Sequence, residues 1–299
     1  MSIVIVGSTA LDSIKTPKKE NPRLLGGSAS YASIAASFFA PVKMVGVVGD
    51  DFPRKYISLY KKHGIDIEGL QIKPGKTFHW SGEYEVNMNN RRTISTELGV
   101  FADFNPVLPE SYRNSEYVLL ANIAPSLQLH VLEQVKKPKF IAADTMDLWL
   151  NIALDDLLKL LKKVDLFVLN DSEAKLLTKD DNVISAICKI HKLGPKNVIV
   201  KKGEHGAILS MSGELFVAPA YPLMKVVDPT GAGDTFLGGL IGYLASVNGD
   251  IKANLRKAVV YGSVVASFCC EGFGVSRLSK VSREEIEQRF QEYRKITGF

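Results

Sequence analysis

The sequence predicts an α/β protein with three layers, in which a mostly parallel central sheet lies between two layers of helices and carries a small β lid. Short apolar runs alternate with helical segments along most of the 299 residues. The runs are continuously hydrophobic, which is typical of strands covered on both faces, as in a parallel sheet. Only 76–99 departs from this rhythm, with an alternation of period 2. The chain, 1–299, is therefore predicted to form a single domain.

The elements follow in order from these patterns. IVIVG at 3–7 is apolar and predicts the first strand, 28–39 has helical spacing, and 42–49 is again strand-like. The amphipathic segment 53–64 predicts a helix that ends at Gly64. Further strands are predicted in the apolar runs at 117–123, 139–145, 166–170 and 197–203.

Two segments are predicted to form the lid. The run 76–99 contains a polar NMNN turn between alternating stretches, which predicts a hairpin. The polar segment 12–25 lies between the first strand and the first helix and can join it. We expect the lid, approximately 12–25 and 74–102, to cover the carboxyl ends of the strands, where open α/β sheets bind ligands.

Composition excludes several classes of protein. The net charge of +5 and the pI of about 8.9 suit an anionic ligand, but the lysines are scattered, so a nucleic-acid partner is not expected. No stretch approaches the roughly 20 apolar residues of a membrane span, and the N-terminus lacks the features of a signal peptide. Three cysteines without CxxC spacing, Cys188, Cys269 and Cys270, indicate reduced thiols in a cytoplasmic protein.

One motif is a false positive. GLQIKPGKT at 69–77 contains Gly-Lys-Thr, but five residues separate its glycines where a P-loop has four, and a β pattern follows it where a P-loop has a helix. The sequence also contains no HExxH, GxSxG or strand-linked GxGxxG motif, so zincin, hydrolase and dinucleotide-binding functions are not predicted.

A glycine-rich turn opens a helix near the C-terminus. Gly231, Ala232 and Gly233 precede Asp234, and apolar residues then follow at helical spacing. Such a turn presents unpaired N–H groups and the positive end of the helix dipole to a developing phosphate charge. Asp234 stays ionised there and can accept a proton from a substrate hydroxyl. The alternative is a tight turn in which Asp234 caps the helix and the glycines serve packing.

A second acidic motif, LNDSEAKLL, lies where a buried strand meets a helix. Asn170 and Glu173 are three residues apart at the carboxyl end of that strand. This pair can hold a hydrated Mg²⁺ through its water molecules. The alternative is an ordinary capping box, in which Asn170 caps the helix and Glu173 reaches back to the backbone.

A third group suits a ligand with hydroxyl groups. Asp12 follows the first strand, and Gly26 and Gly27 open the first helix. A carboxylate accepts two hydroxyl hydrogen bonds, and a glycine pair lets backbone amides approach the ligand. A simple turn explains either motif when it is taken alone.

Together with VIVKKGEHGA at 198–207, these motifs resemble in their order the ribokinase-like (PfkB) carbohydrate and nucleoside kinases over essentially the whole chain. The resemblance implies transfer of the γ-phosphate of ATP, with Mg²⁺, to a hydroxyl of a sugar or polyol. A nucleoside is the alternative acceptor, and a ligand-binding regulator without turnover is a rival from another class. By this resemblance Asp234 is the base, and the amides of Ala232, Gly233 and Asp234 form the anion hole. The implied ATP-binding residues are Asn170, Glu173, Lys202, Gly203 and Gly206. The implied acceptor-binding residues are Asp12, Gly26, Gly27, Tyr31 and Asp234.

The resemblance also implies a monovalent cation, K⁺, at Asp228 and Thr230, with the turn 271–276 as the second half of its site. Where ribokinases continue the glycine pair with Lys-Gly-Ala-Asn, this chain has Ser28 to Tyr31, which disfavours ribose. The aromatic residues Tyr31, Phe78, Trp80 and Trp149 can form a flatter pocket or belong to the core, and the core is favoured for Trp149. The expected partner is a small molecule. The protein is expected to be a monomer, or a homodimer formed through the lid edge.

Overall fold

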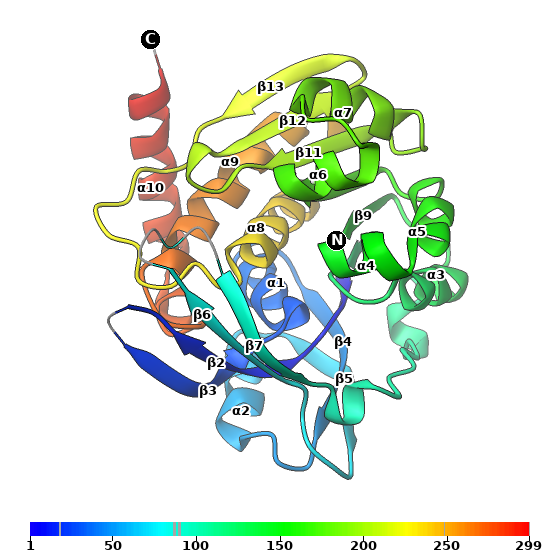
Figure 1. Ribbon diagram of the computed structural model, residues 1–299, viewed down its shortest axis with the longest axis vertical. Coiled ribbons are helices and arrows are strands. Elements are labelled where there is room, and N and C mark those ends of the chain that lie inside the picture. The colour runs from blue at the N-terminus through cyan, green and yellow to red at the C-terminus, as the bar shows by residue number, and fades with distance from the viewer. Residues whose placement is uncertain (18, 86–87, 89–90, 248, 299) are drawn as a thin grey trace.

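The structure is a computed structural model that describes residues 1–17, 19–85, 88, 91–247 and 249–298. Its main feature is a nine-stranded sheet (Figure 1). All neighbouring strands in it are parallel except around β12, which is antiparallel to both of its neighbours. In spatial order the strands are β13 (Glu214–Ala218), β12 (Ala207–Met211), β11 (Asn197–Lys201), β10 (Leu166–Asn170), β9 (Phe140–Asp144), β8 (Tyr117–Leu120), β1 (Ile3–Val6), β4 (Val42–Gly49) and β5 (Asp66–Lys73).

Helices cover both faces of this sheet, because successive side chains of each strand point to opposite faces. Ile3 and Ile5 of β1 belong to one hydrophobic core, whereas Val4 and Val6 belong to another. The first core is closed by α1 (Ser28–Ser37), α2 (Arg54–Lys62), α8 (Ala232–Val247), α9 (Ile251–Cys270) and α10 (Arg283–Thr297).

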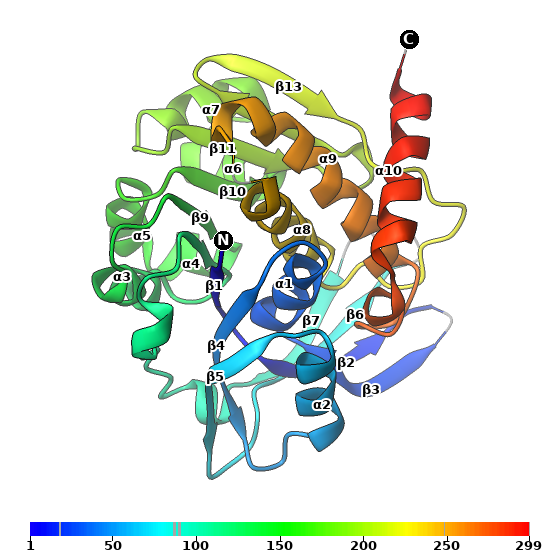
Figure 2. The ribbon, with the colours of Figure 1, turned by 180° about the vertical axis from the view of Figure 1, so that it is seen from behind.

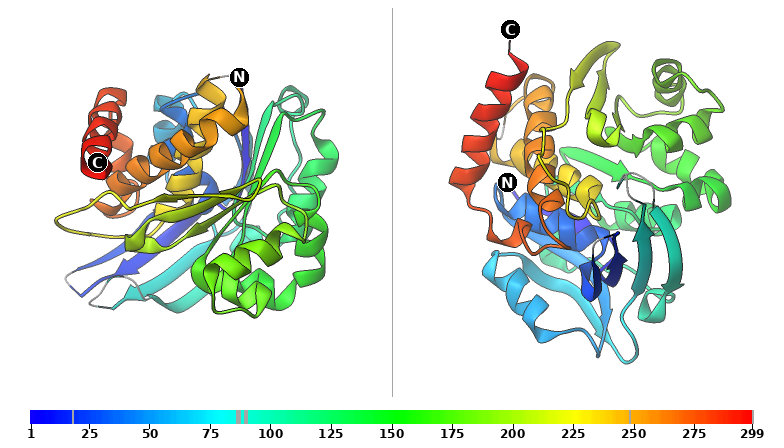
Figure 3. Two further views of the ribbon diagram at one scale, coloured as in Figure 1. Left: turned by 90° about the horizontal axis from the view of Figure 1, so that it is seen from above. Right: turned by 60° about the vertical axis from the view of Figure 1, so that its left-hand side comes forward.

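The second core is closed by α3 (Pro125–Gln134), α4 (Asp147–Ile152), α5 (Leu154–Leu161), α6 (Asp171–Thr178) and α7 (Val183–His191). Seen from behind, the first set of helices faces the viewer (Figure 2), and the view from above separates the two sets across the sheet (Figure 3). The predicted three-layer α/β/α architecture with a mostly parallel sheet is therefore confirmed. Short 3₁₀ helices complete the connections: η1 (Gly99–Phe101), η2 (Glu110–Tyr112), η3 (Gly203–His205) and η4 (Leu278–Lys280).

A separate four-stranded sheet crosses in front of α1 (Figure 1). Its strands, in spatial order, are β3 (Glu20–Gly26), β2 (Ala10–Lys15), β6 (His79–Tyr84) and β7 (Arg91–Glu97). The parallel pairing of β2 with β6 joins the two chain segments that the sequence sets apart from the α/β body. We call this sheet the lid sheet. In the NMNN turn, Asn87, Asn89 and Asn90 lie outside the described residues.

Helices α1 and α8 approach each other closely where α8 contains glycine. A Cβ atom at Gly238 would lie 2.2 Å from the carbonyl oxygen of Ala32, and one at Gly242 would lie 2.9 Å from Ala36. These glycines therefore allow the two backbones to pack in direct contact, which offsets the low helix propensity of glycine. The contact fixes the beginning of α8, which carries Asp234, against the first helix.

The structure also contains elements that the sequence patterns leave unspecified. These are the edge strand β5, the antiparallel pair β12 and β13, and the long helices α9 and α10. Among the described residues, no helix combines the length and the apolar character that a membrane span requires.

Candidate active site

Three polar side chains meet at the carboxyl edge of the main sheet. Asp144, Asn170 and Lys201 are the last residues of β9, β10 and β11. These strands are parallel neighbours, with Asn170 in register with Lys201 and Val168 in register with Asp144. Because parallel strands end at the same edge, segments far apart in the sequence converge where α/β sheets bind ligands.

The glycine-rich turn directs the start of α8 toward this edge. Gly231 has a φ of +77°, and a Cβ atom on it would lie 2.5 Å from the ring of Tyr31, so only glycine fits there. Asp234 lies in the first turn of the helix. The N–H of Ala232 donates to the carbonyl of Pro229 at 3.1 Å, whereas the N–H of Gly233 has no hydrogen-bond partner among the described residues. Of these two predicted anion-hole donors, Gly233 is the one available to a ligand.

Asp228 connects the turn to the segment 271–276. One carboxylate oxygen of Asp228 accepts from the N–H of Thr230 at 2.9 Å and the other from the N–H of Gly274 at 3.0 Å. Burial raises the pKa of Asp228, and these N–H donors work against that rise. The two halves of the predicted cation site are therefore joined by a direct hydrogen bond, while the cation itself stays a prediction.

Asn170 and Glu173 form a capping box at the start of α6. The Asn170 side chain accepts from the Glu173 N–H at 2.8 Å, and a Glu173 carboxylate oxygen accepts from the Asn170 N–H at 2.7 Å. Burial raises the pKa of Glu173 to about 7, although Lys201 lowers it in part. The capping box that the sequence offers as an alternative is thus present, and it holds the Glu173 carboxylate close to the carboxyl edge of the sheet.

A buried ion pair lies at the same edge, and sequence reasoning missed both of its members. The Lys201 ammonium is 3.0 and 3.3 Å from the two carboxylate oxygens of Asp144. The exposed fraction of the side chain is 19% for Lys201 and 5% for Asp144. Burial lowers the pKa of Lys201, but Asp144, Glu173 and Asp234 outweigh this effect and leave it above its ordinary value. Lys201 is therefore a fixed positive charge among carboxylates.

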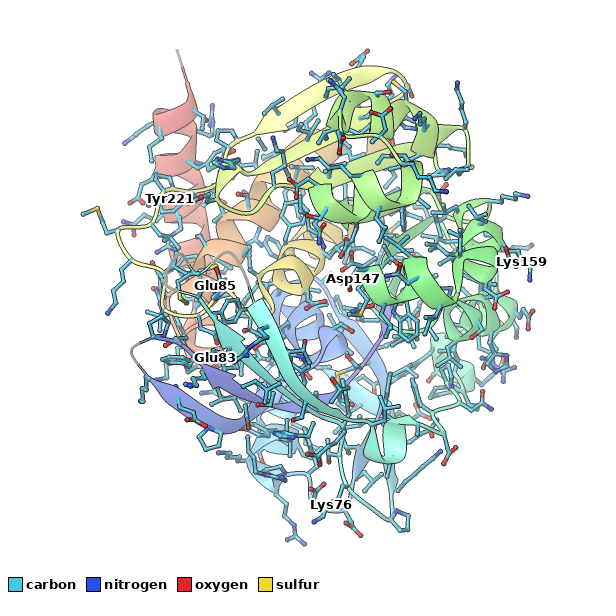
Figure 4. The ribbon with its side chains drawn as sticks, in the orientation of Figure 1. Lys76, Glu83, Glu85, Asp147, Lys159 and Tyr221 are labelled. Carbon is cyan, nitrogen blue, oxygen red and sulfur yellow. The ribbon has the colours of Figure 1, made fainter. Side chains whose placement is uncertain are left out.

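A cavity of about 570 Å³ opens beside this ion pair. Five chain segments line it: Met88 between β6 and β7, the end of β11 with the following turn, the loop before α8, the first turns of α8, and one face of α9. Lys201, Gly203, Gly206 and Gly233 belong to the lining, whereas Lys202 does not. Figure 4 shows Tyr221, another lining residue, in the loop beside α10, and Asp147 at the start of α4. The size and the adjacent N–H and ammonium groups suit an extended anionic ligand.

The predicted acceptor residues lie on the lid sheet and at the start of α1. Asp12 is buried on β2, and a Cβ atom at Gly26 would lie 1.9 Å from its carboxylate. Gly26 therefore leaves the space that the carboxylate occupies. Gly27, with a φ of +91°, precedes the first turn of α1. Tyr31 is 1% exposed with its ring against Gly231, so it supports the turn from the core side, and contact with an acceptor stays a prediction.

The other aromatic residues have different environments. Trp80 is in register with Asp12 and packs against Gly82, with its indole N–H on the Thr93 hydroxyl at 3.2 Å. Phe78 stacks on Phe101. Trp149 is half-buried and outside both cores, and it donates to Asn122 just after β8 at 2.8 Å. The core placement favoured for Trp149 is therefore wrong, because its indole N–H binds a polar partner near the carboxyl edge.

The model of the pfkB family carbohydrate kinases matches residues 2–281, which is nearly the whole chain. The chain belongs to the PfkB family. It is therefore a phosphotransferase with an alcohol acceptor from an ATP-using kinase family, as the sequence motifs predict.

Relatives within the PfkB family differ in their acceptors. The cytidine kinase of Thermococcus kodakarensis is 31% identical over 251 residues, covering 81% of this chain and 88% of that protein. A ribokinase of Arabidopsis thaliana is 27% identical over 310 residues, covering 90% and 76%. The solved structure of a Burkholderia thailandensis nucleoside kinase in complex with inosine has a TM-score of 0.80 at 21% identity, covering 99% of this chain and 98% of that one, which shows the shared fold.

Proposed function

We propose that the protein transfers the γ-phosphate of ATP to a hydroxyl group of a nucleoside. The observation that carries the proposal is the position of Asp234, in the first turn of α8, beside the available Gly233 N–H and the Lys201 ammonium. A carboxylate, an anion-binding N–H and a cation at the end of one cavity are the parts that phosphoryl transfer requires.

The reaction needs little covalent participation from the protein. Asp234 accepts the proton of the acceptor hydroxyl, whose oxygen forms a bond to the γ-phosphorus. The bond between that phosphorus and the bridging oxygen breaks, and ADP leaves with the electron pair. The Gly233 N–H and the helix dipole of α8 stabilise the charge on the transferred group. The lid sheet excludes water, which would otherwise take the place of the acceptor.

The oxygen atoms at the carboxyl edge suit Mg²⁺. Glu173, Asp144 and Asp147 lie close enough for the two aspartates to raise the pKa of Glu173, so the corner is rich in hard oxygen donors. Among the described residues there is no cluster of three or more side chains that would ligate a metal directly. Asn170 and Glu173 would therefore hold the ion through its water molecules, and the ion would supply positive charge for the phosphate oxygens.

The acceptor class rests on two observations. One relative with 31% identity is a cytidine kinase, although a 2-dehydro-3-deoxygluconokinase of Haemophilus influenzae is also 31% identical. Ser28 to Tyr31 replace the residues that follow the glycine pair in ribokinases. Asp12 would accept hydrogen bonds from two hydroxyls of the acceptor sugar. A free sugar or polyol is the second candidate, because Asp12 and the glycine pair serve any vicinal diol equally and a ribokinase is 27% identical to this chain.

We also propose K⁺ in the loop formed by Asp228, Thr230 and the segment 271–276. The bond from the Gly274 N–H to Asp228 supports this, since it joins the two segments whose backbone carbonyl groups would surround the ion. A cation there would stabilise the turn that precedes Asp234. The expected result is higher activity in KCl than in LiCl at equal ionic strength.

The decisive experiment measures ADP release with Mg-ATP across cytidine, adenosine, inosine, ribose, fructose and myo-inositol, in parallel on Asp234→Asn. We expect a nucleoside to stimulate ADP release strongly, and the variant to lose about 10²–10⁴-fold of this rate. Stimulation only by a free sugar would replace the nucleoside proposal with the second candidate. Calorimetric binding of an acceptor without any ADP release would favour a ligand-binding regulator.

A further inference from the structure

A purely structural ion pair at the position of Lys201 and Asp144 would contribute little to the stability of the protein. Both side chains are largely buried. Burying two charges costs several kcal/mol per ion, and their mutual attraction must offset this cost. Lys201 lies on the cavity wall, and Asp144 contacts its ammonium from the end of β9. The position of the pair at the carboxyl edge therefore calls for a functional explanation.

The Lys201 ammonium lies against the bare backbone of the first turn of α8. A Cβ atom at Gly233 would be 3.1 Å from the Lys201 nitrogen. Lys201 and Gly233 are therefore neighbours in the lining of the cavity. A phosphate oxygen bound beside both residues would meet a cation and an N–H donor.

The geometry of the ammonium leaves a donor for a ligand. Lys201 has three N–H donors, and the two carboxylate oxygens of Asp144 occupy the side that faces β9. Asp144 restrains a long and flexible side chain, which reduces the entropy lost when a phosphate binds. The two remaining nearby carboxylates, Glu173 and Asp234, keep the ammonium protonated.

The carboxylates of the site also require the positive charge of Lys201 if a triphosphate is to bind. Ser28 stands where ribokinases have a lysine after the glycine pair, so α1 begins with a neutral residue. Asp144, Glu173 and Asp234 would repel a triphosphate unless cations offset them. Lys201 lies among all three of these carboxylates.

We infer that Lys201, positioned by Asp144, binds the phosphoryl group that is transferred and stabilises its charge during transfer. The inference rests on the proposed kinase function and identifies the side chain that supplies positive charge to the transferred group. Lys201 exchanges no proton in the reaction, because Asp234 receives the proton of the acceptor. Asp144 acts only through Lys201 and is a positioning residue.

The test compares Lys201→Met, Lys201→Arg and Asp144→Asn with a matched control, Lys196→Met. Lys196 is a lysine just before β11 that pairs with Asp165 at 3.8 Å, at the opposite end of the strand. Two quantities are measured for each variant with Mg²⁺: the rate of acceptor-dependent ADP release, and the calorimetric affinities for ADP and for the non-hydrolysable analogue AMP-PNP. Circular dichroism and thermal unfolding establish that each variant is folded.

We expect Lys201→Met to lower kcat by about 10²–10³-fold, the loss typical of one transition-state donor. It should also reduce the preference for AMP-PNP over ADP, because only the analogue has a γ-phosphoryl group. Lys201→Arg should recover part of both quantities, and Asp144→Asn should lower kcat by a smaller factor with a modest rise in KM for ATP. Lys196→Met should match the wild type in both.

Two results would overturn the inference: a folded Lys201→Met variant with wild-type kcat, or one that keeps the full preference for AMP-PNP. If Lys201→Met does not fold, the same criteria apply to Asp144→Asn, which retains the shape of the pair. Failure of the kinase function itself has a different signature, since no acceptor would then stimulate ADP release by the wild-type protein. The binding comparison would still decide whether Lys201 contacts the terminal phosphoryl group.

Discussion

The hydroxyl of Thr230 donates a hydrogen bond to the hydroxyl of Tyr84 at 3.0 Å. Tyr84 is the last residue of β6 in the lid sheet, and Thr230 immediately precedes Gly231 of the glycine-rich turn. Both side chains are buried. The lid sheet and the glycine-rich turn are therefore in direct contact, and the position of one affects the other.

Replacing Tyr84 with Phe should uncouple phosphate transfer from ATP consumption. The variant loses a buried hydrogen bond worth about 1 kcal/mol, so the lid sheet is held less firmly over the turn and water enters more often. The measurement is the ratio of ADP formed to acceptor phosphorylated, which should rise above that of the wild type. In a double-mutant cycle with Thr230→Val, the second substitution should add little to the first; additive effects would show that this bond does not couple the two elements.

Substituting Gly26 with Ala should weaken acceptor binding and spare ATP binding. The new methyl group would lie 1.9 Å from the present position of the Asp12 carboxylate, which must move. We expect KM for the acceptor to rise about tenfold or more, the order of one lost hydrogen bond to a charged group, while KM for ATP stays within twofold. Gly249→Ala is the control, because the nearest atom to a Cβ there is the nitrogen of the flexible Asn254 side chain at 3.0 Å and the residue does not line the cavity. An equal rise in both KM values would argue for general distortion.

Local sequence pattern predicts the backbone position of several candidate residues. Asn170 ends β10, and Glu173 and Asp234 lie in the first turns of α6 and α8, in the predicted manner, whereas Asp12 lies within β2 of the lid sheet. Tyr31 was harder to place, since a helix residue beside a glycine pair can face either the core or a ligand. Only the approach of α8 to α1 decides this, and it places the Tyr31 ring on Gly231.

Lys201 shows why the rest could not be predicted. Two lysines follow each other in VKKG, and adjacent residues of a strand point in opposite directions, so one of them at most faces the ligand. The register of β11 beside β10 makes that residue Lys201 and not Lys202. A signal for Asp144 did exist, because a carboxylate at the end of a buried strand belongs to the edge where ligands bind.

Gly238→Ala should destabilise the protein without altering the site directly. The added methyl group would lie 2.2 Å from the Ala32 carbonyl oxygen, which belongs to the backbone and cannot rotate away. Overpacking of this kind costs about 1–3 kcal/mol of unfolding free energy. Urea unfolding would measure it, with Ser246→Ala on the exposed part of α8 as a control expected within about 0.5 kcal/mol of the wild type. Wild-type stability of Gly238→Ala would show that the helices can separate at no cost.

His63 should make stability depend on pH in the mildly acidic range. Burial, assisted by Lys62, lowers the pKa of His63 below its ordinary value of 6.5, although the bond to the Ser279 carbonyl opposes the shift. The unfolded chain therefore binds the proton first as pH falls below 6.5, so the contribution of neutral His63 is complete above that value and is lost as pH falls through the folded pKa.

The measurement for His63 is the free energy of unfolding at about pH 7.5 and about pH 5.5, a range that spans the ordinary histidine pKa. His63→Gln retains a hydrogen-bond donor for Ser279 and cannot titrate. The variant should lose less stability than the wild type over this interval. Identical pH dependence in the two proteins would exclude His63 as the titrating group.

The capping box of Asn170 and Glu173 affects how variants of this protein are interpreted. The same two hydrogen bonds begin α6 and hold the Glu173 carboxylate near Lys201 at the carboxyl edge of the main sheet. We therefore expect a substitution at either position to lower both the amount of folded enzyme and its turnover. In a saturation-mutagenesis screen these positions would be depleted for two superimposed reasons, and only a parallel assay of protein abundance would separate them.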